Sequence, residues 1–322
     1  MNENLLEVRN LVKHFPVRKG LIFQHVKGWI KAVDGVTFSI LKGKTFGLVG
    51  ESGCGKTTTS KLILLLEKAT SGSILFKGKE VQSLNREGLK EYRRSVQVVF
   101  QDPYSSLSPR MQVGDIIAEP LVVNESFPRS VVKTRVKELL TTVGLSSEAA
   151  SLFPHEFSGG QRQRIAIARA LALKVDLIIL DEPVSALDVS IRAQIMNLLM
   201  DLQDRLGLSY LLIAHDLGVV TCMSDIIAVM YLGKIVELAP AKALATSPRH
   251  PYTKALFSAA LPSHPDEYRE EILLSGEVTS PLNPPSGCRF RPRCGCTEPL
   301  CLQKEPLLRL IDESRYIACH LF

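Results

Sequence analysis

The sequence predicts an α/β protein with a mostly parallel sheet. From Ser158 onward a helix is followed by a strand at 175–180, a helix at 191–206 and a strand at 210–214. This alternation is typical of parallel strands joined by crossover helices. A short apolar run at 46–49 is followed by a glycine-rich loop and an amphipathic helix, which adds one more unit of the same kind.

The remaining segments predict two additions to this sheet. Alternating apolar positions indicate strands at 5–12 and 32–49, and the glycine- and lysine-containing stretch 18–31 between them predicts a loop insertion. A hairpin is expected around 71–78. A polar, proline-marked segment and then a helical pattern at 131–143 predict an inserted helical subdomain at about 102–170.

Length and composition predict one large domain and one small one. A chain of 322 residues lies near the length at which a single core stops growing. We place the large domain at 1–262 and a C-terminal extension at 263–322, where prolines interrupt regular structure and five of the seven cysteines gather. A hydrophobic content of 45% and a charged content of 22% exclude disordered, collagen-like and disulfide-scaffold classes.

Several partners and locations are excluded by the same observations. No apolar run approaches the roughly 18 to 20 residues that span a bilayer, and the N-terminus lacks the pattern of a signal peptide, so we expect a cytoplasmic chain. The net charge of +6 is mild and mixed with acidic residues, and aromatic content is 6%. These values favour a solvated face over a nucleic-acid surface.

The motif GESGCGKTT has the spacing GxxxxGK[ST] between a strand and a helix, the context that a phosphate-binding loop requires. The backbone N–H groups and the helix N-terminus surround the phosphates, Lys56 reaches the β- and γ-phosphates, and Thr57 ligates magnesium. A glycine-rich turn by chance is the weaker alternative. The predicted nucleotide-binding residues of the loop are Gly50, Glu51, Ser52, Gly53, Cys54, Gly55, Lys56, Thr57 and Thr58.

Two acidic residues end a later apolar strand, LIILDE. Asp181 can hold magnesium, usually through water, and Glu182 can polarise an attacking water. The alternative is an ordinary solvated strand end. The four apolar residues before the pair and the matching phosphate loop favour the catalytic interpretation.

Upstream, FSGGQRQRIAIARAL places a serine and two glycines at the start of an amphipathic helix, where bare N–H groups make an anion site. Here the sequence resembles the ATP-binding-cassette (ABC) family, whose signature SGGQ is present as Ser158, Gly159, Gly160 and Gln161. The resemblance implies a RecA-like core sheet, an antiparallel β subdomain and an inserted helical subdomain. It also implies an ATPase that uses ATP and magnesium.

The resemblance further implies how the site works. Two cassettes pair head to tail, so that the Ser158 helix of one covers the nucleotide of the other. Gln101 contacts magnesium and the lytic water, Asp188 in the segment SALD bridges the dimer, His215 contacts the γ-phosphate, and Phe15 stacks on adenine. For His215 and Phe15 taken alone, an ordinary strand-end or core role is the alternative.

Three further segments resemble one branch of the family, the ATPases of oligopeptide, dipeptide and nickel importers: 98–121, HPYTKALFSA at 250–259 and the tail at 275–294. The expected function is therefore to energise import of oligopeptides or dipeptides. The expected partners are a second ATPase subunit, a heterodimer being favoured, two membrane permease subunits and indirectly an extracytoplasmic binding protein. The chain would then lie at the cytoplasmic face of the membrane.

Other functions stay open. The same machinery could import nickel or glutathione-like solutes, because cargo is selected by other subunits. A non-transport ABC ATPase acting on DNA or ribosomes is a distant alternative, disfavoured because the chain has one cassette and no long coiled-coil insertion.

The tail cysteines Cys288, Cys294, Cys301 and Cys319 suggest a metal rather than disulfides in a cytosolic protein. Four thiolates could hold an iron–sulfur cluster of the [4Fe–4S] type or a structural zinc. No CxxC pair supports the usual zinc knuckle, and reduced thiols in a packed tail are the alternative.

Overall fold

The computed structural model describes residues 3–19, 25–102, 106–124, 127–259, 272–274, 276 and 279–322. The chain forms two compact units. The first contains Met1–Glu3, Leu41–Lys44 and Ser83–Leu211, and the second contains Asn4–Ile40, Thr45–Gln82 and Leu212–Phe322. The predicted boundary near residue 262 lies outside the described residues, and the predicted domain limits stay a prediction.

In the first unit, two parallel strands support the acidic motif. Strand β6 (Val96–Val99) pairs in parallel with β7 (Leu177–Asp181), and every residue of β7 is buried. Helix α2 (Arg86–Ser95) leads directly into β6, and the side chain of Asn85 accepts from the N–H of Gly88 to cap it. Helix α7 (Val189–Leu206) follows β7, and β8 (Ser209–Ile213) comes next in the chain.

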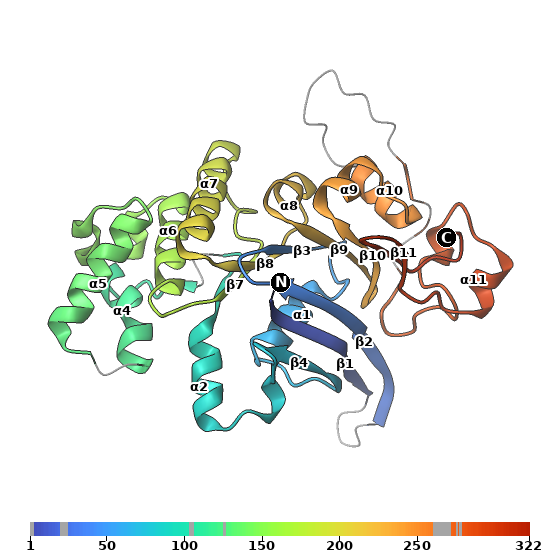
Figure 1. The fold of residues 1–322 in the computed structure, drawn as a ribbon, viewed down its shortest axis with the longest axis horizontal. Coiled ribbons are helices and arrows are strands. Elements are labelled where there is room, and N and C mark those ends of the chain that lie inside the picture. Colours follow the sequence, from blue (N-terminus) through green and yellow to red (C-terminus); the bar gives the residue numbers. More distant parts are fainter. Residues whose placement is uncertain are drawn as a thin grey trace. The chain divides into compact units, whose positions relative to one another are not determined.

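A group of helices makes up the rest of the first unit (Figure 1). It consists of α4 (Val113–Asn124), α5 (Arg129–Thr142) and α6 (Gly159–Ala170), with short 3-10 turns at Ser147–Ser151 and Pro154–Glu156. Each helix buries an apolar stripe, for example Ile117, Leu140 and Ile167. These helices lie within the segment predicted as a helical subdomain, about 102–170.

The second unit contains an antiparallel sheet in the order β2-β1-β4-β5 (Figure 1). Its strands are β1 (Asn4–Lys19), β2 (His25–Leu41), β4 (Ser71–Phe76) and β5 (Lys79–Glu80). The loop predicted at 18–31 is wrong over most of its length, because β1 runs to Lys19 and β2 begins at His25. Pairing between the two neighbouring strands satisfies the backbone there, so Gly28 does not interrupt β2. Residues 20–24 lie outside the described residues.

A second set of strands in this unit includes part of the C-terminal extension. Strand β3 (Thr45–Val49) pairs in parallel with β9 (Ile226–Tyr231), which pairs antiparallel with β10 (Lys234–Pro240). Strand β12 (Arg315–Ile317) pairs with β10, and β11 (Arg309–Asp312) pairs with β12. The extension therefore contributes two strands to the edge of this sheet.

Short helices complete the second unit. They are α1 (Lys56–Ile63), α8 (Leu217–Met223), α9 (Ala241–Thr246), α10 (Pro251–Ser258) and α11 (Pro299–Gln303), with 3-10 turns at Val81–Ser83 and Arg291–Arg293.

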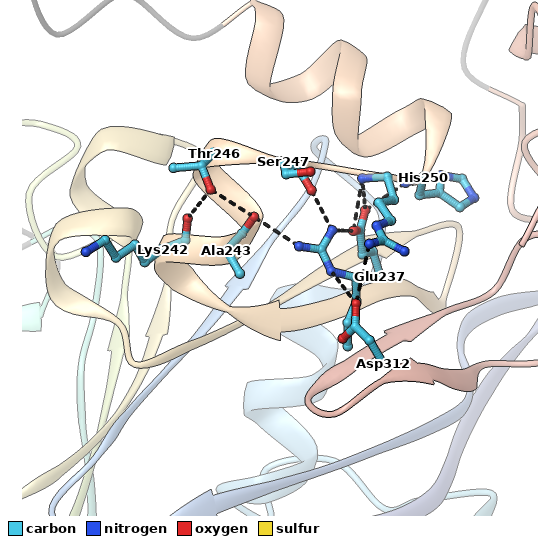
Figure 2. A network of polar contacts seen from close by, with 9 residues as sticks. Glu237, Lys242, Ala243, Thr246, Ser247, His250 and Asp312 are labelled. Carbon is cyan, nitrogen blue, oxygen red and sulfur yellow. Dashed lines mark hydrogen bonds and ion pairs between the residues drawn. The ribbon is translucent and has the colours of Figure 1, made fainter.

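A buried carboxylate joins the extension to β10. Glu237 is 0% exposed and accepts hydrogen bonds from the N–H groups of Arg249, at 3.1 Å, and His250, at 2.9 Å. Arg315 of β12 donates to the same carboxylate at 3.1 Å and also donates to the carbonyls of Ala243 and Ser247. Figure 2 shows Glu237 with Ser247 and His250 around it. Because a buried charge needs several partners, this network fixes β12 against β10 and the start of α10.

His250 is buried at the start of α10, where its Nδ1 accepts from the N–H of Tyr252 at 3.1 Å and caps the helix. Burial lowers the pKa of His250 to about 3, and a backbone hydrogen bond with Ala318, the smaller effect, acts in the opposite direction. The folded protein therefore holds this ring neutral, whereas the unfolded chain takes up a proton below about pH 6.5.

We predict that His250→Asn reduces the acid sensitivity of the fold. Since the wild-type pKa is lowered on folding, the unfolded state binds more protons between about pH 6.5 and 3, and stability falls as the pH falls through that window. Asparagine keeps a cap acceptor but does not titrate. Between pH 7 and 5 the wild type should lose about 2 kcal/mol more free energy of unfolding than the variant, measured by urea unfolding.

His155→Asn, at a histidine with an exposed side chain, is the matched control and should follow the wild type. Equal losses in the wild type and His250→Asn would contradict the role given to burial.

Candidate functional site

The predicted phosphate loop lies in the second unit, between β3 and α1. Lys56 is 6% exposed, and its ammonium donates to the carbonyls of Gly50, at 2.6 Å, and Glu51, at 3.0 Å. Ser52, Gly53 and Thr57 are exposed on the loop. Burial raises the pKa of the Cys54 thiol, while Lys56 opposes the rise, so the thiol stays protonated.

The loop lies so close to neighbouring backbone that two of its positions admit only glycine. A Cβ at Gly50, with φ 149°, would lie 2.2 Å from the carbonyl oxygen of Met230, and a Cβ at Gly55, with φ 115°, would lie 2.1 Å from that of Ala32. Gly55 is also the N-cap of α1 and brings no side chain to that helix end, while the Cys54 thiol has a hydrogen bond with the backbone of Lys56 in the first turn. A buried cation beside a helix N-terminus therefore fits a phosphate group.

Glu51 is anchored by residues that the sequence analysis did not connect to the loop. Its N–H donates to the hydroxyl of Tyr252 at 2.9 Å. Its carboxylate accepts from Nη1 of Arg293 at 2.8 and 3.1 Å. Burial, the largest single effect, acts to lower the pKa of Arg293, but Glu51 and the hydroxyl of Tyr231 together outweigh it and the pKa is raised. No local sequence signal could have found this contact, since Arg293 lies in the tail, far from the loop along the chain.

Tyr252 belongs to a cluster of four buried rings. Tyr231, Tyr252 and Phe290 pack with ring centroids 4.7 to 5.4 Å apart, and His250 lies 5.7 Å from Phe290. The rings come from β9, from the start of α10 and from the extension. A second ion pair, between Arg289 and Asp34, flanks the cluster. The extension is therefore packed tightly against the elements that carry the phosphate loop.

Two other predicted nucleotide contacts lie in the same unit. Phe15 is on β1, half-buried, with the Lys13 ammonium 4.7 Å from its ring centroid. His215 is exposed just after β8, and the neighbouring Asp216 caps α8 by accepting from the N–H groups of Gly218 and Val219. Both side chains are accessible, as their predicted roles require.

The acidic pair lies in the first unit at the end of β7. Asp181 is the last strand residue and is 8% exposed, whereas Glu182 is half-buried. Glu182 has φ 52°, a left-handed conformation that a non-glycine residue rarely adopts. Its carbonyl accepts from the hydroxyl of Ser185 at 3.1 Å, which stabilises the sharp turn. Strain of this kind gathers at functional sites, and here it falls on the residue predicted to be the base.

The signature residues begin α6 in the first unit. Ser158 accepts from the N–H of Gln161 at 3.4 Å, and the Gln161 side chain accepts from the N–H of Ser158 at 3.0 Å, forming a capping box. Gly160 also serves packing, because a Cβ there would lie 2.5 Å from Ile191 of α7. Gly159 is the first residue of α6. Gln101 lies shortly after β6, Asp188 is the N-cap of α7, and both are exposed.

The tail cysteines lie near one another but do not form a metal site in the described residues. The Cys301 thiol is close enough to raise the pKa values of Cys288, Cys294 and Cys319, although burial is the larger cause for each. Burial raises the pKa of Cys288 to about 11. Among the described residues, no group of three or more histidine, cysteine or acidic side chains is arranged to hold a metal ion. The geometry therefore gives no support to an iron–sulfur cluster or zinc.

Within the described part of the chain, no helix combines the length and apolar character needed to cross a membrane.

Comparisons with known proteins find two matching family models and relatives that align with almost the whole chain. Residues 33–185 match the family model "ABC transporter", and residues 236–301 match "Oligopeptide/dipeptide transporter, C-terminal region". The chain is 50% identical over 323 residues to the oligopeptide transport ATP-binding protein AppF of Bacillus subtilis, covering 99% of this chain and 98% of that protein. It is 48% identical to the dipeptide transport ATP-binding protein DppF of Escherichia coli, with coverage of 96% and 92%.

A solved structure is also similar. The dimeric ATP-binding cassette MJ0796, in a post-hydrolysis state bound to ADP and Pi, matches with a TM-score of 0.64 and 28% identity, covering 73% of this chain and 98% of that one. The P-loop cassette fold and the α/β class expected from the sequence are thereby confirmed. Relatives that are about 50% identical align with almost the whole chain. The chain therefore belongs to the ABC transporter family as one of its ATP-binding ATPases.

Proposed function

We propose that this chain hydrolyses ATP to energise an ABC importer for oligopeptides or dipeptides. The observation that carries the proposal is the match across the C-terminal region at 236–301, in addition to the cassette, because that region is named for oligopeptide and dipeptide transporters. Relatives named for both cargo classes align over almost the whole chain. Nickel or glutathione-like cargo is the alternative, since other subunits select the solute.

We assign the chemistry to the residues as follows. Lys56 and the N–H groups at the start of α1 hold the phosphates of ATP. Thr57, Gln101 and Asp181 would hold magnesium, which neutralises developing charge on the phosphates when it is bound. Glu182 polarises the attacking water, and His215 contacts the γ-phosphate. Phe15 stacks on adenine.

We propose that two such cassettes pair head to tail, with Ser158, Gly159, Gly160 and Gln161 of one facing the nucleotide of the other and Asp188 bridging the pair. The family similarity and the dimeric state of the MJ0796 cassette support this arrangement. The partner is a related sibling subunit. Two permease subunits hold the pair at the cytoplasmic face of the membrane, and an extracytoplasmic binding protein delivers cargo.

We predict that Glu182→Gln lowers ATP hydrolysis by about 10²- to 10⁴-fold. ATP affinity should change little, because the amide removes the base and leaves the phosphate loop intact. Hydrolysis and nucleotide binding would be measured on the full chain assembled with its partner subunits. Glu138→Gln, at an exposed carboxylate of α5, is the control and should hydrolyse ATP at the parent rate. An unchanged rate of ATP hydrolysis in Glu182→Gln would contradict the assignment of Glu182 as the base.

The cargo can be named by uptake. Cells carrying either the intact chain or Glu182→Gln would be given labelled dipeptide, a longer peptide or nickel, with all other subunits unchanged. We predict that the variant loses uptake of a peptide, since import needs hydrolysis. Loss of nickel uptake alone would select the alternative cargo, and no loss of any uptake would contradict the importer assignment.

A resident metal at the tail cysteines stays a prediction of the sequence alone. Chain purified without oxygen should contain iron and acid-labile sulfide, or zinc, and Cys288→Ser should lose it while Cys222→Ser keeps it. Wild-type protein without metal would support the alternative of reduced thiols in a packed tail.

A further inference from the structure

Every polar group of Glu51 has a partner in the second unit, although Glu51 is only the second residue of the phosphate loop. The N–H donates to the hydroxyl of Tyr252 at 2.9 Å, and the carbonyl accepts from Nζ of Lys56 at 3.0 Å. The carboxylate accepts from Nη1 of Arg293 at 2.8 and 3.1 Å. Neither the N–H nor the carboxylate is therefore directed at a phosphate.

The two outer anchors, Tyr252 of α10 and Arg293 of the extension, are linked through Phe290. The Arg293 side chain is 8% exposed and follows Phe290 by three residues on the 3-10 turn. Phe290 packs on the ring of Tyr252 with centroids 5.4 Å apart, and both rings are buried. The Arg293 guanidinium is buried, and the Glu51 side chain is 26% exposed. A charged hydrogen bond to a buried guanidinium is stronger than one between two exposed side chains.

The anchored residue also controls Lys56. The Lys56 ammonium is oriented by the carbonyls of Gly50 and Glu51, so the position of the Glu51 peptide sets where the charge lies. A loop held in this way before nucleotide binds has less conformational freedom to lose on binding.

We propose that Arg293, in the C-terminal extension, is a positioning residue for the ATP site: through Glu51 it holds the phosphate loop in its binding conformation. The role rests on the proposed function, because it needs ATP to bind at that loop. The extension then does more than add two strands to the edge of the sheet. It contributes to nucleotide affinity from a part of the chain that lies outside the cassette motifs.

The test measures MgATP and MgADP affinity of the full chain by calorimetry. Arg293→Ala should weaken MgATP binding by about tenfold, the size of a typical coupling between sites. Glu51→Ala should weaken it similarly, and the double variant should be no weaker than either single variant, because both remove the same contact. Arg293→Lys, which keeps the charge, should recover part of the affinity.

Arg291→Ala is the matched control. Arg291 lies on the same 3-10 turn, but the hydrogen bonds given for its side chain among the described residues go to Ser286 and Leu302 of the extension, so MgATP affinity should not change. The melting temperature of each nucleotide-free variant separates positioning from folding, since a purely structural loss lowers it without changing the affinity of the folded protein. If Arg293→Ala does not fold, Glu51→Gln is tested instead. This substitution weakens the ion pair with Arg293 and keeps the hydrogen bond from the N–H of residue 51 to Tyr252.

Wild-type affinity in Arg293→Ala, or additive losses in the double variant, would overturn the proposal. Failure of the wild type itself to bind or hydrolyse MgATP would instead overturn the proposed function, so the two failures are distinguishable.

Discussion

The close approach of the phosphate loop to the backbone of its own unit is the constraint on which the nucleotide site depends. The oxygens of Met230 and Ala32 leave no space for a Cβ at Gly50 and Gly55, and both residues also have a positive φ, which glycine adopts without strain. The tight turn closes over the Lys56 ammonium and makes Gly55, which has no side chain, the N-cap of α1. A cation is thus held beside the N-terminus of α1, in a loop conformation that only glycine can adopt at these two positions without a clash.

The C-terminal extension is integrated into the second unit by buried charges, each with a partner from another element. Arg315 joins Glu237, Arg289 joins Asp34, and Arg293 joins Glu51. Such pairs add little net stability compared with apolar packing, but removing one partner leaves an uncompensated charge. They therefore specify how the extension is seated more than they strengthen the fold. The ring cluster around Phe290 supplies the apolar contact between them.

In the first unit, a left-handed backbone at Glu182 and a capping box at Ser158 orient the remaining predicted functional residues. Glu182 follows a fully buried strand and takes a left-handed conformation, so its side chain leaves the strand in a direction that an extended residue could not give. Ser158 and Gln161 cap α6 reciprocally and fix the start of the signature helix. These are local devices, each made within a few residues of chain.

The sequence by itself determined the chemistry and the family, because the phosphate loop, the acidic strand end and the signature are each contiguous, and their function depends on local backbone geometry. It also predicted most helices and strands from their periodicity. Only the tertiary structure decided the features that depend on distant partners. Pairing between β1 and β2 converts most of the stretch at 18–31 into strand, and β12 finds its neighbour in β10. Arg293 reaches Glu51 because folding brings the tail to the loop, and no pattern within either segment records that contact.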